Sequence, residues 1–198
     1  MRALADAIEE RGWQTITYRD VLAYMQAGEC PPENTVIVSI DDLGTNWLRV
    51  DFIPMVETFI ERDMVLVLGA VVEGPQDPEV WERFKQWQEA GMEIASHSLS
   101  HYELPALTDA ALEEQMAGSY EVICENLGAC PITFILTFGK GADDPRVVEA
   151  ARAYTFLISI QGGRSFGTAL PYVLGRIPPN NDDQTITLNI LAASFGAP

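Results

Sequence analysis

The stretch that decides the fold is Thr35-Val36-Ile37-Val38-Ser39-Ile40-Asp41-Asp42, residues 35–42 of a chain of 198. Its first six residues are mostly β-branched, which favours a strand. An apolar run without a polar alternation is typical of a parallel strand that is buried on both faces. Two carboxylates follow where this run ends. The stretch therefore predicts a buried parallel strand that delivers two acids to one edge of a sheet.

Strand and helix candidates alternate on both sides of this stretch. Further strands are expected over residues 13–17, 64–72, 92–95, 132–136, 155–160 and 185–191, and helices over residues 2–11, 17–25, 49–62, 78–90, 108–127 and 144–153. The long polar segment 161–184 is expected to be a loop, either a surface excursion or part of a site rim. This alternation predicts an α/β fold with parallel strands.

A closed or nearly closed βα barrel is favoured over a doubly wound sheet. The reason is that no glycine-rich phosphate turn follows any of the strand candidates. The chain shows no internal repeat, low-complexity tract or interdomain linker. We therefore expect a single domain over residues 1–198, a size that allows one substantial core.

The formal net charge of −17 excludes some classes of partner. Nucleic acids and anionic membranes both bind surfaces with clustered Lys and Arg, so neither is expected as a partner of this acidic chain. No apolar stretch approaches the ~18–20 residues of a membrane span. Residues 1–12 carry charges among spaced apolar residues and predict an amphipathic helix, not a secretory signal.

The three cysteines, Cys30, Cys124 and Cys130, match no zinc ribbon or redox pair. A short-loop disulfide between Cys124 and Cys130 and free buried thiols both remain open, and with them the redox compartment.

Two histidines, the only ones in the chain, follow directly on a strand candidate. They are His97 and His101, and Asp41 and Asp42 likewise stand at a strand end. In parallel βα barrels the loops at the carboxyl ends of the strands build the site. Two imidazoles and one carboxylate that leave a fourth position open suit catalytic zinc. The alternative is that the aspartates cap a turn and that the spacing of the histidines is incidental. A zincin helix is excluded, because the two histidines lack the Glu that such a helix carries between them.

Three segments resemble motifs of the polysaccharide deacetylase family, carbohydrate esterase family 4 with its NodB-homology domain. Residues 39–42 with Gly44 resemble its Thr-Phe-Asp-Asp-Gly motif. Residues 93–101, Glu-Ile-Ala-Ser-His-Ser-Leu-Ser-His, resemble its His-Ser/Thr-x-x-His motif and the approach to it. Residues 134–139, Phe-Ile-Leu-Thr-Phe-Gly, resemble a variant of its third motif. With the approach segment 12–17, the resemblance covers about residues 1–160 in order.

The resemblance implies a distorted (β/α)7 barrel and a divalent metal, usually Zn²⁺. By motif position, the metal ligands are Asp42, His97 and His101, and Asp41 is the catalytic base. The backbone N–H of Phe138 would help to hold the oxyanion. The implied activity is removal of acetyl groups, N-acetyl before O-acetyl, from a polysaccharide. The family also implies an extracytoplasmic or cell-envelope location.

The sequence departs from the family pattern at several positions. Leu43 separates the aspartate pair from Gly44, and Ile135 stands where the family has an Arg that orients the base. Arg164 or Arg176 could replace that Arg from another loop. Thr137 takes the place of the family's Pro.

The family's late motif supplies a His as general acid, and this chain has no third histidine. Either Asp41 returns the proton, or another acid such as Asp182 or Asp183 serves, or turnover is slow or absent. Trp47, Tyr102 and Phe138 lie next to the motifs and could stack on sugar rings.

Two alternatives to a polysaccharide deacetylase stay open. The same barrel could hydrolyse a small amide or cyclic imide. A non-catalytic relative that binds carbohydrate or metal would explain the lost Arg and His, but it would not need Asp41.

Overall fold

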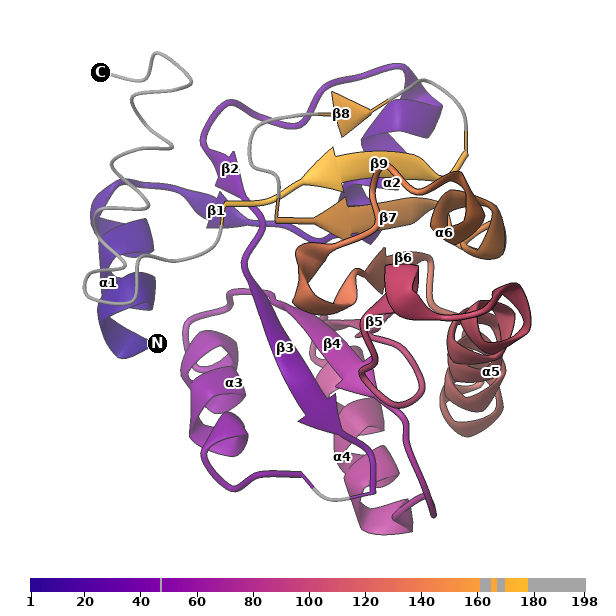
Figure 1. Cartoon of the computed structure of the whole chain (residues 1–198). Helices are drawn as coiled ribbons and strands as arrows, with labels where there is room; N and C mark the ends of the chain where they lie inside the picture. The colour runs from indigo at the N-terminus through magenta and orange to yellow at the C-terminus, as the bar shows by residue number, and fades with distance from the viewer. Residues whose placement is uncertain (47, 161–164, 167–169, 178–198) are drawn as a thin grey trace.

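A sheet of mostly parallel strands forms the centre of the computed structural model, which describes residues 1–46, 48–160, 165–166 and 170–177 (Figure 1). The strand order is β3-β4-β5-β6-β7-β9-β8. Its members are β3 (Ser39–Gly44), β4 (Val67–Val71), β5 (Glu93–Ser96), β6 (Thr133–Ile135), β7 (Phe156–Ser159), β8 (Ser165–Phe166) and β9 (Tyr172–Gly175). All pairs are parallel except β8 with β9. The order never reverses along the parallel strands, as expected for a barrel and not for a doubly wound sheet.

Helices lie between the strands along the chain, and most of them pack against the outer face of the sheet. They are α1 (Arg2–Glu10), α2 (Tyr18–Ala27), α3 (Phe52–Ile60), α4 (Pro78–Glu89), α5 (Asp109–Leu127) and α6 (Pro145–Ala150), with short 3-10 turns η1 (Leu104–Ala106) and η2 (Thr137–Gly139). Thr17 and Asp20 form the capping box of α2, and Thr108 caps α5 through the Ala111 N–H. These caps satisfy backbone donors that the first helical turn leaves without partners. A separate parallel pair, β1 (Gln14–Thr15) and β2 (Thr35–Val36), lies beside α1.

Alternate residues of each strand face opposite sides of the sheet, as the pleat requires. The outer side chains pack under the helices. Leu68 and Ala70 of β4 join residues of α1, α3 and α4, while Phe134 of β6 and Leu157 of β7 join residues of α5 and α6. The inner side chains form a smaller cluster, which includes Val67, Ala95, Ile135, Phe156, Ile158, Tyr172 and Leu174. The sheet is therefore buried on both faces, which explains its apolar strands.

The first turn of α2 covers the inner face where the strands begin. Tyr18 packs its ring 5.4 Å from that of Phe156, the first residue of β7. Glu93, the first residue of β5, is 1% exposed. Its carboxylate accepts hydrogen bonds from the Arg19 N–H of α2 (3.1 Å) and from the Thr133 hydroxyl of β6 (2.5 Å). Burial raises the pKa of Glu93 despite these partners. One buried carboxylate thus joins α2 to two strands.

The predicted α/β class with parallel strands is confirmed. Within it, the run 35–40 is divided, because Thr35–Val36 pairs with β1 and only Ser39 onward enters the large sheet. The expectation of a loop over 161–184 was wrong in part: β8 and β9 lie inside it. The expected strand 185–191 lies outside the described residues. In the described ranges no helix is long and apolar enough to cross a membrane.

Replacing Glu93 by Ala should destabilise the fold strongly. The change leaves the Thr133 hydroxyl and the Arg19 N–H without their acceptor, and hydrogen bonds to a charged group are worth about 1.5–3 kcal/mol each. We expect the free energy of unfolding, measured in urea, to fall by roughly 3 kcal/mol. Glu89→Ala, at an exposed position of α4, is the control and should change it by no more than about 0.5 kcal/mol. Equal stabilities of the two variants would contradict the role assigned to Glu93.

Candidate metal centre

Three side chains converge at the end of the sheet where the parallel strands finish. Asp42 comes from β3, and His97 and His101 come from the loop that follows β5. Nε2 of His101 lies 3.1 Å from Oδ1 of Asp42 and 3.1 Å from Nε2 of His97. Nε2 of His97 lies 3.4 Å from Oδ1 of Asp42. The structure thus brings together the three residues that the sequence predicted as ligands.

The spacing of these three atoms fits a tetrahedral cation. Ligand atoms at about 2.0–2.1 Å from a common zinc ion, at tetrahedral angles, lie roughly 3.3–3.4 Å apart. The observed separations of 3.1–3.4 Å are close to this value. Three electron-rich atoms packed so closely repel one another unless protons or a cation lie between them. The donor set and its geometry are therefore consistent with a metal site.

The orientation of His97 supports this conclusion. Its Nδ1 lies 2.8 Å from the Ile135 carbonyl oxygen of β6. Because a carbonyl only accepts, Nδ1 carries the proton, and Nε2 turns its lone pair toward Asp42 and His101. A hydrogen bond of this kind on the second ring nitrogen is typical of metal-ligating histidines. His97 is 2% exposed, so its ring is also held by packing.

A β-bulge explains why two consecutive aspartates serve one site. Ile40 pairs with Leu68 and Leu43 pairs with Ala70, so β3 has one residue more than β4 between these pairs. Asp42 in the bulge has φ 64°. In a regular strand Asp41 and Asp42 would face opposite sides of the sheet. The extra residue instead turns Asp42 toward the histidines, and Leu43, which the sequence marked as a departure, returns to the buried outer face.

The histidine loop is anchored to α5 and to itself. The backbone carbonyl of Gln115 accepts the Leu99 N–H (3.1 Å), and its side-chain oxygen accepts the Ser100 N–H (2.8 Å). The Ser98 hydroxyl accepts the His101 N–H at 2.8 Å. Sequence reasoning missed Gln115, although a polar residue among Leu112, Met116 and Ile123 on the buried side of α5 was a usable signal.

Backbone strain is concentrated around the three ligands. Among the described non-glycine residues, positive φ angles occur at Asp42, Ser98, His101, Phe138 and Asp63, and the first four border the site. Such conformations cost about 1–3 kcal/mol each and persist where surrounding contacts impose them. The Phe138 ring lies 4.7 Å from the His101 ring and is exposed, and so is Tyr102. The third motif therefore contributes an aromatic wall beside a ligand.

Asp41 points to the inner side of the sheet and is paired with Arg176. Nη1 of Arg176 donates to Oδ1 of Asp41 at 2.8 Å, and Nη2 donates to Oδ2. The guanidinium also donates to the Ser39 hydroxyl at 2.8 Å. Of the two arginines that the sequence left open, Arg176 makes this pair, and Arg164 lies outside the described residues. Ile135, at the position of the family's Arg, is buried on the inner face.

The surroundings favour the metal-binding forms of Asp42 and His101. The neighbouring His97 side chain is the main cause that lowers the pKa of Asp42, against an opposing effect of burial. Burial, followed by the nearby His97, lowers the pKa of His101. Burial also lowers the pKa of Arg176, but the hydrogen bond and charge of Asp41 outweigh it and raise that pKa. An ionised Asp42 and a neutral His101 are the forms that bind a cation.

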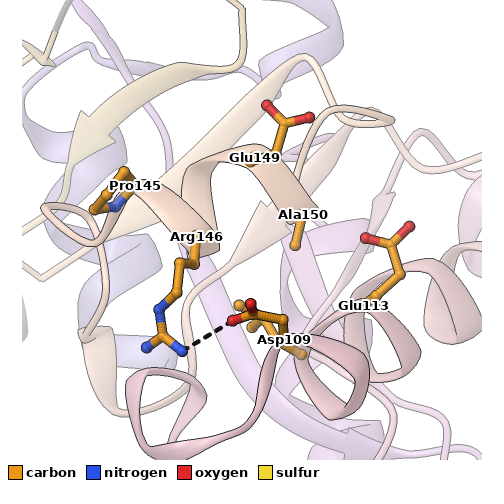
Figure 2. Close-up of a pocket in the computed structure, with 7 residues that line it drawn as sticks. Asp109, Glu113, Pro145, Arg146, Glu149 and Ala150 are labelled. Carbon is orange, nitrogen blue, oxygen red and sulfur yellow. Dashed lines mark hydrogen bonds and ion pairs between the residues drawn. The ribbon is translucent and has the colours of Figure 1, made fainter.

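Other features fall outside this site. A groove of about 350 Å³ between α5 and α6 is lined by Asp109, Leu112, Glu113, Pro145, Arg146, Glu149 and Ala150 (Figure 2). None of these residues belongs to the three ligands or to the Asp41–Arg176 pair. The candidate acids Asp182 and Asp183 and the aromatic residue Trp47 lie outside the described residues.

Sequence comparison identifies a family. The model of the family described as polysaccharide deacetylase matches residues 28–157. YxkH of Bacillus subtilis, which is provisionally named a polysaccharide deacetylase, is 23% identical over 172 residues. The match covers 86% of this chain and 60% of that protein, so the chain spans about three fifths of the relative's length.

Solved structures show the same fold at low sequence identity. The deacetylase PplD of Streptococcus pyogenes, solved in complex with acetate, superposes with a TM-score of 0.80 at 14% identity, over 96% of this chain and 84% of that one. A de-N-acetylase of Aggregatibacter actinomycetemcomitans gives a TM-score of 0.70 at 15% identity, over 92% and 85% of the two chains.

Replacing His101 by Ala should abolish metal binding without unfolding the protein. The side chain supplies one of three ligand atoms, and its ring is partly exposed, so little packing is lost. We expect elemental analysis to find about one zinc-like ion per wild-type chain and far less in the variant. Ser100→Ala, in the same loop, should retain the metal because Ser100 is anchored through its backbone N–H. Equal metal content in wild type and His101→Ala would refute the assignment.

Proposed function

Because the chain belongs to the polysaccharide deacetylase family, we propose that it is a metal-dependent hydrolase that removes acetyl groups from a polysaccharide or amino-sugar polymer. N-acetyl groups are the proposed targets before O-acetyl groups. The observation that carries the proposal is the convergence of Asp42, His97 and His101, with a carboxylate outside the set, Asp41, next in the chain. We propose that residues 1–198 act as one deacetylase domain.

The proposed cofactor is Zn²⁺, because two imidazoles and one carboxylate are its usual partners when a fourth position stays open. When bound, such a cation supplies Lewis acidity, which polarises the acyl carbonyl and makes water more acidic. Asp42, His97 and His101 would hold it. His97 keeps its lone pair directed at the site through its bond to Ile135, and His101 is kept neutral by its surroundings.

Asp41 is proposed as the general base. It would take a proton from the water that attacks the acetamide carbonyl carbon. The C–N bond then breaks, and the products are acetate and a free amine on the sugar. The leaving nitrogen needs a proton, and the chain contains no third histidine to provide it. We propose that Asp41 returns the proton it accepted, which serves both halves of the reaction with one group.

The third motif would bind the reacting end of the substrate. Phe138 is proposed to place its backbone N–H near the developing oxyanion. Its exposed ring beside His101 and the exposed ring of Tyr102 offer apolar faces next to the site, to which a sugar ring can stack. The expected partner is therefore a polysaccharide or oligosaccharide chain lying across the carboxyl ends of the strands.

A non-catalytic binding protein and a hydrolase of small amides are the competing functions. The Asp41–Arg176 pair favours catalysis over pure binding, because a site of three metal ligands needs neither residue.

Replacing Asp41 by Asn should retain the metal and lose most of the turnover. Asn has nearly the same shape as Asp but cannot accept the proton from the attacking water, and losing a general base typically costs ~10²–10⁴-fold. Acetate release is measured from acetylated glucosamine oligomers, chitin fragments and acetylxylan, with metal content determined on the same samples. Long incubations and a metal-stripped control are required, since the absence of a third histidine leads us to expect a low wild-type rate.

Asp51→Asn is the matched control, because Asp51 pairs with Arg49 on an exposed surface. It should leave the rate unchanged. If Asp41→Asn hydrolyses as fast as wild type, Asp41 is not the base. If fully loaded wild type releases no acetate from any of the three substrates, binding or small-amide hydrolysis replaces the proposed function.

We propose an extracytoplasmic or cell-envelope location, and the cysteines support it. Cys124 and Cys130 form a disulfide between the end of α5 and the start of β6, while Cys30 is free and exposed. Disulfides persist mainly in oxidising compartments. Thiol alkylation of protein from its native host should label Cys30 alone before reduction and all three cysteines after it. Labelling of all three cysteines without reduction would contradict this location.

A further inference from the structure

Three buried hydroxyl groups meet on the outer face of the sheet, between β5, α5 and the segment that leads into β7. They belong to Ser96, Ser119 and Tyr154, which are 0%, 0% and 2% exposed. Oγ of Ser96 lies 2.7 Å from Oγ of Ser119. Oγ of Ser119 lies 3.2 Å from the hydroxyl oxygen of Tyr154. The mechanism proposed above uses none of these groups.

The pleat of β5 places this cluster directly behind a metal ligand. Ser96 is the last residue of β5, and His97 is the next residue in the chain. Successive side chains of a strand face opposite sides of the sheet. The ring of His97 accordingly reaches the Ile135 carbonyl oxygen of β6, whereas Ser96 contacts Ser119 of α5. The position of Ser96 therefore bears on the loop that carries both histidines.

The hydrogen atoms of the three hydroxyl groups satisfy every contact when they point in one direction. Tyr154 donates to the Met116 carbonyl oxygen at 2.8 Å, because a carbonyl only accepts. Burial raises the pKa of Tyr154, so this donor keeps its proton. The single hydrogen of Ser119 has the same carbonyl, at 3.0 Å, and the Tyr154 oxygen as acceptors. Ser96 then donates to Ser119, and its own oxygen is left to accept.

The histidine loop, residues 97–101, uses this acceptor. The Ser98 N–H donates to Oγ of Ser96 at 3.3 Å, and Oγ of Ser98 accepts the His101 N–H at 2.8 Å. Ser98 has φ 74° and His101 has φ 54°, which are conformations that surrounding contacts must maintain. Hydrogen bonds thus run without a gap from the interior of α5 to the backbone of a metal ligand.

We infer that Ser119 and Tyr154 are positioning residues of the metal centre, because through Ser96 they hold the histidine loop in the conformation that presents His101. The inference rests on the metal centre of the proposed function. It is independent of the substrate proposed above.

The helix α5 holds the histidine loop at two places on one face. Gln115 binds two backbone N–H groups of the loop. Ser119, four residues further along the same face, acts on the loop through Ser96. An apolar side chain at position 119 would fill a similar volume, but the Ser96 hydroxyl would lose its acceptor in a place that water does not reach.

The experiment measures Zn²⁺ affinity, by competition with a chelator, in Ser119→Ala, Ser96→Ala and the double variant. Tyr154→Phe tests the far end of the hydroxyl chain. Two matched controls remove a hydroxyl outside the chain. Ser100→Ala lies in the histidine loop, where Ser100 is anchored through its backbone N–H. Tyr120→Phe changes a ring that packs 5.4 Å from the ring of Tyr154. Circular dichroism verifies that each variant is folded at the temperature used.

Ser119→Ala and Ser96→Ala should each raise the Zn²⁺ dissociation constant by about 10-fold, since losing a group that orients a ligand typically weakens metal binding 10- to 100-fold. The double variant should bind no more weakly than Ser96→Ala, because both changes act through the same N–H of Ser98. Tyr154→Phe should shift the constant in the same direction but less, since Ser119 keeps its carbonyl acceptor. Both controls should bind Zn²⁺ like wild type.

Two further measurements separate positioning from a general loss of stability. In the metal-free proteins, amide hydrogen exchange over residues 97–101 should be faster in Ser119→Ala and Ser96→Ala, while residues 156–159 of β7 keep the wild-type rate. With Co²⁺ in place of Zn²⁺, the visible absorption spectrum of these two variants should change shape, because the spectrum reports ligand geometry and not the stability of the fold.

The inference is overturned if folded Ser119→Ala or Ser96→Ala binds Zn²⁺ like wild type, or if their losses add in the double variant. It is also overturned if exchange in β7 rises as much as in the histidine loop, because the hydroxyl groups would then only stabilise the fold. Should Ser119→Ala not fold, Ser96→Ala and Tyr154→Phe decide by the same measurements.

Failure of the proposed function has a different signature. If wild type binds Zn²⁺ but releases no acetate, only the proposed activity fails. If wild type binds no metal, the proposed function fails, and exchange of residues 97–101 in the metal-free variants still decides whether the hydroxyl chain holds the loop.

Discussion

The extra residue in β3 is the constraint on which the site depends. A β-strand sends successive side chains to opposite faces, so two adjacent aspartates cannot normally share one task. The bulge between Ile40 and Leu43 removes this limit. Asp41 stays on the inner face and meets Arg176, while Asp42 turns to the histidines through a left-handed backbone conformation. A carboxylate suited to bind a cation and another suited to move protons thus come from neighbouring positions.

Polar groups on the inner face of the sheet have different roles at its two ends. At the end where the strands begin, Glu93 binds α2 and Thr133 and holds the fold together. At the end where they finish, Arg176 and Asp41 occupy the same inner face, with the rings of Phe156 and Tyr172 among the apolar residues of that face. Each buried charge has partners, as its desolvation requires. The inner face therefore supports the fold at one end and borders the candidate site at the other.

The strained loops at the carboxyl ends of the strands are held by contacts from outside the site. Gln115 of α5 fixes the histidine loop, and the Thr137 hydroxyl donates to the Tyr102 carbonyl at 2.5 Å, which joins the second and third motifs. Gly139 packs so closely on Ile160 that a Cβ would lie 2.2 Å from its side chain. These contacts hold Ser98, His101 and Phe138 in left-handed conformations that non-glycine residues rarely adopt. The packed helix and strands around these three residues thus maintain their strained backbone conformations.

The sequence by itself determined the class of fold and the three candidate ligands. Apolar runs of strand length indicate buried parallel strands, and polar residues directly after such runs indicate the edge where sites form, because both signals are local in the chain. The third motif likewise pointed to Phe138, which lies beside His101.

Three features were decided only by the tertiary structure. They are the pairing of Asp41 with Arg176, the carbonyl group that orients His97, and the presence of β9 within the expected loop. The apolar run Tyr172-Val173-Leu174 is short, and Pro171 and Gly175 on its two sides are typical of a loop, so the sequence did not predict a strand there. The partners of Arg176 lie more than 130 residues away, and nothing in the local pattern distinguishes it from a solvated arginine. Strand pairing and side-chain contacts over such separations are decided by the packing of the whole sheet, which no single stretch of sequence contains.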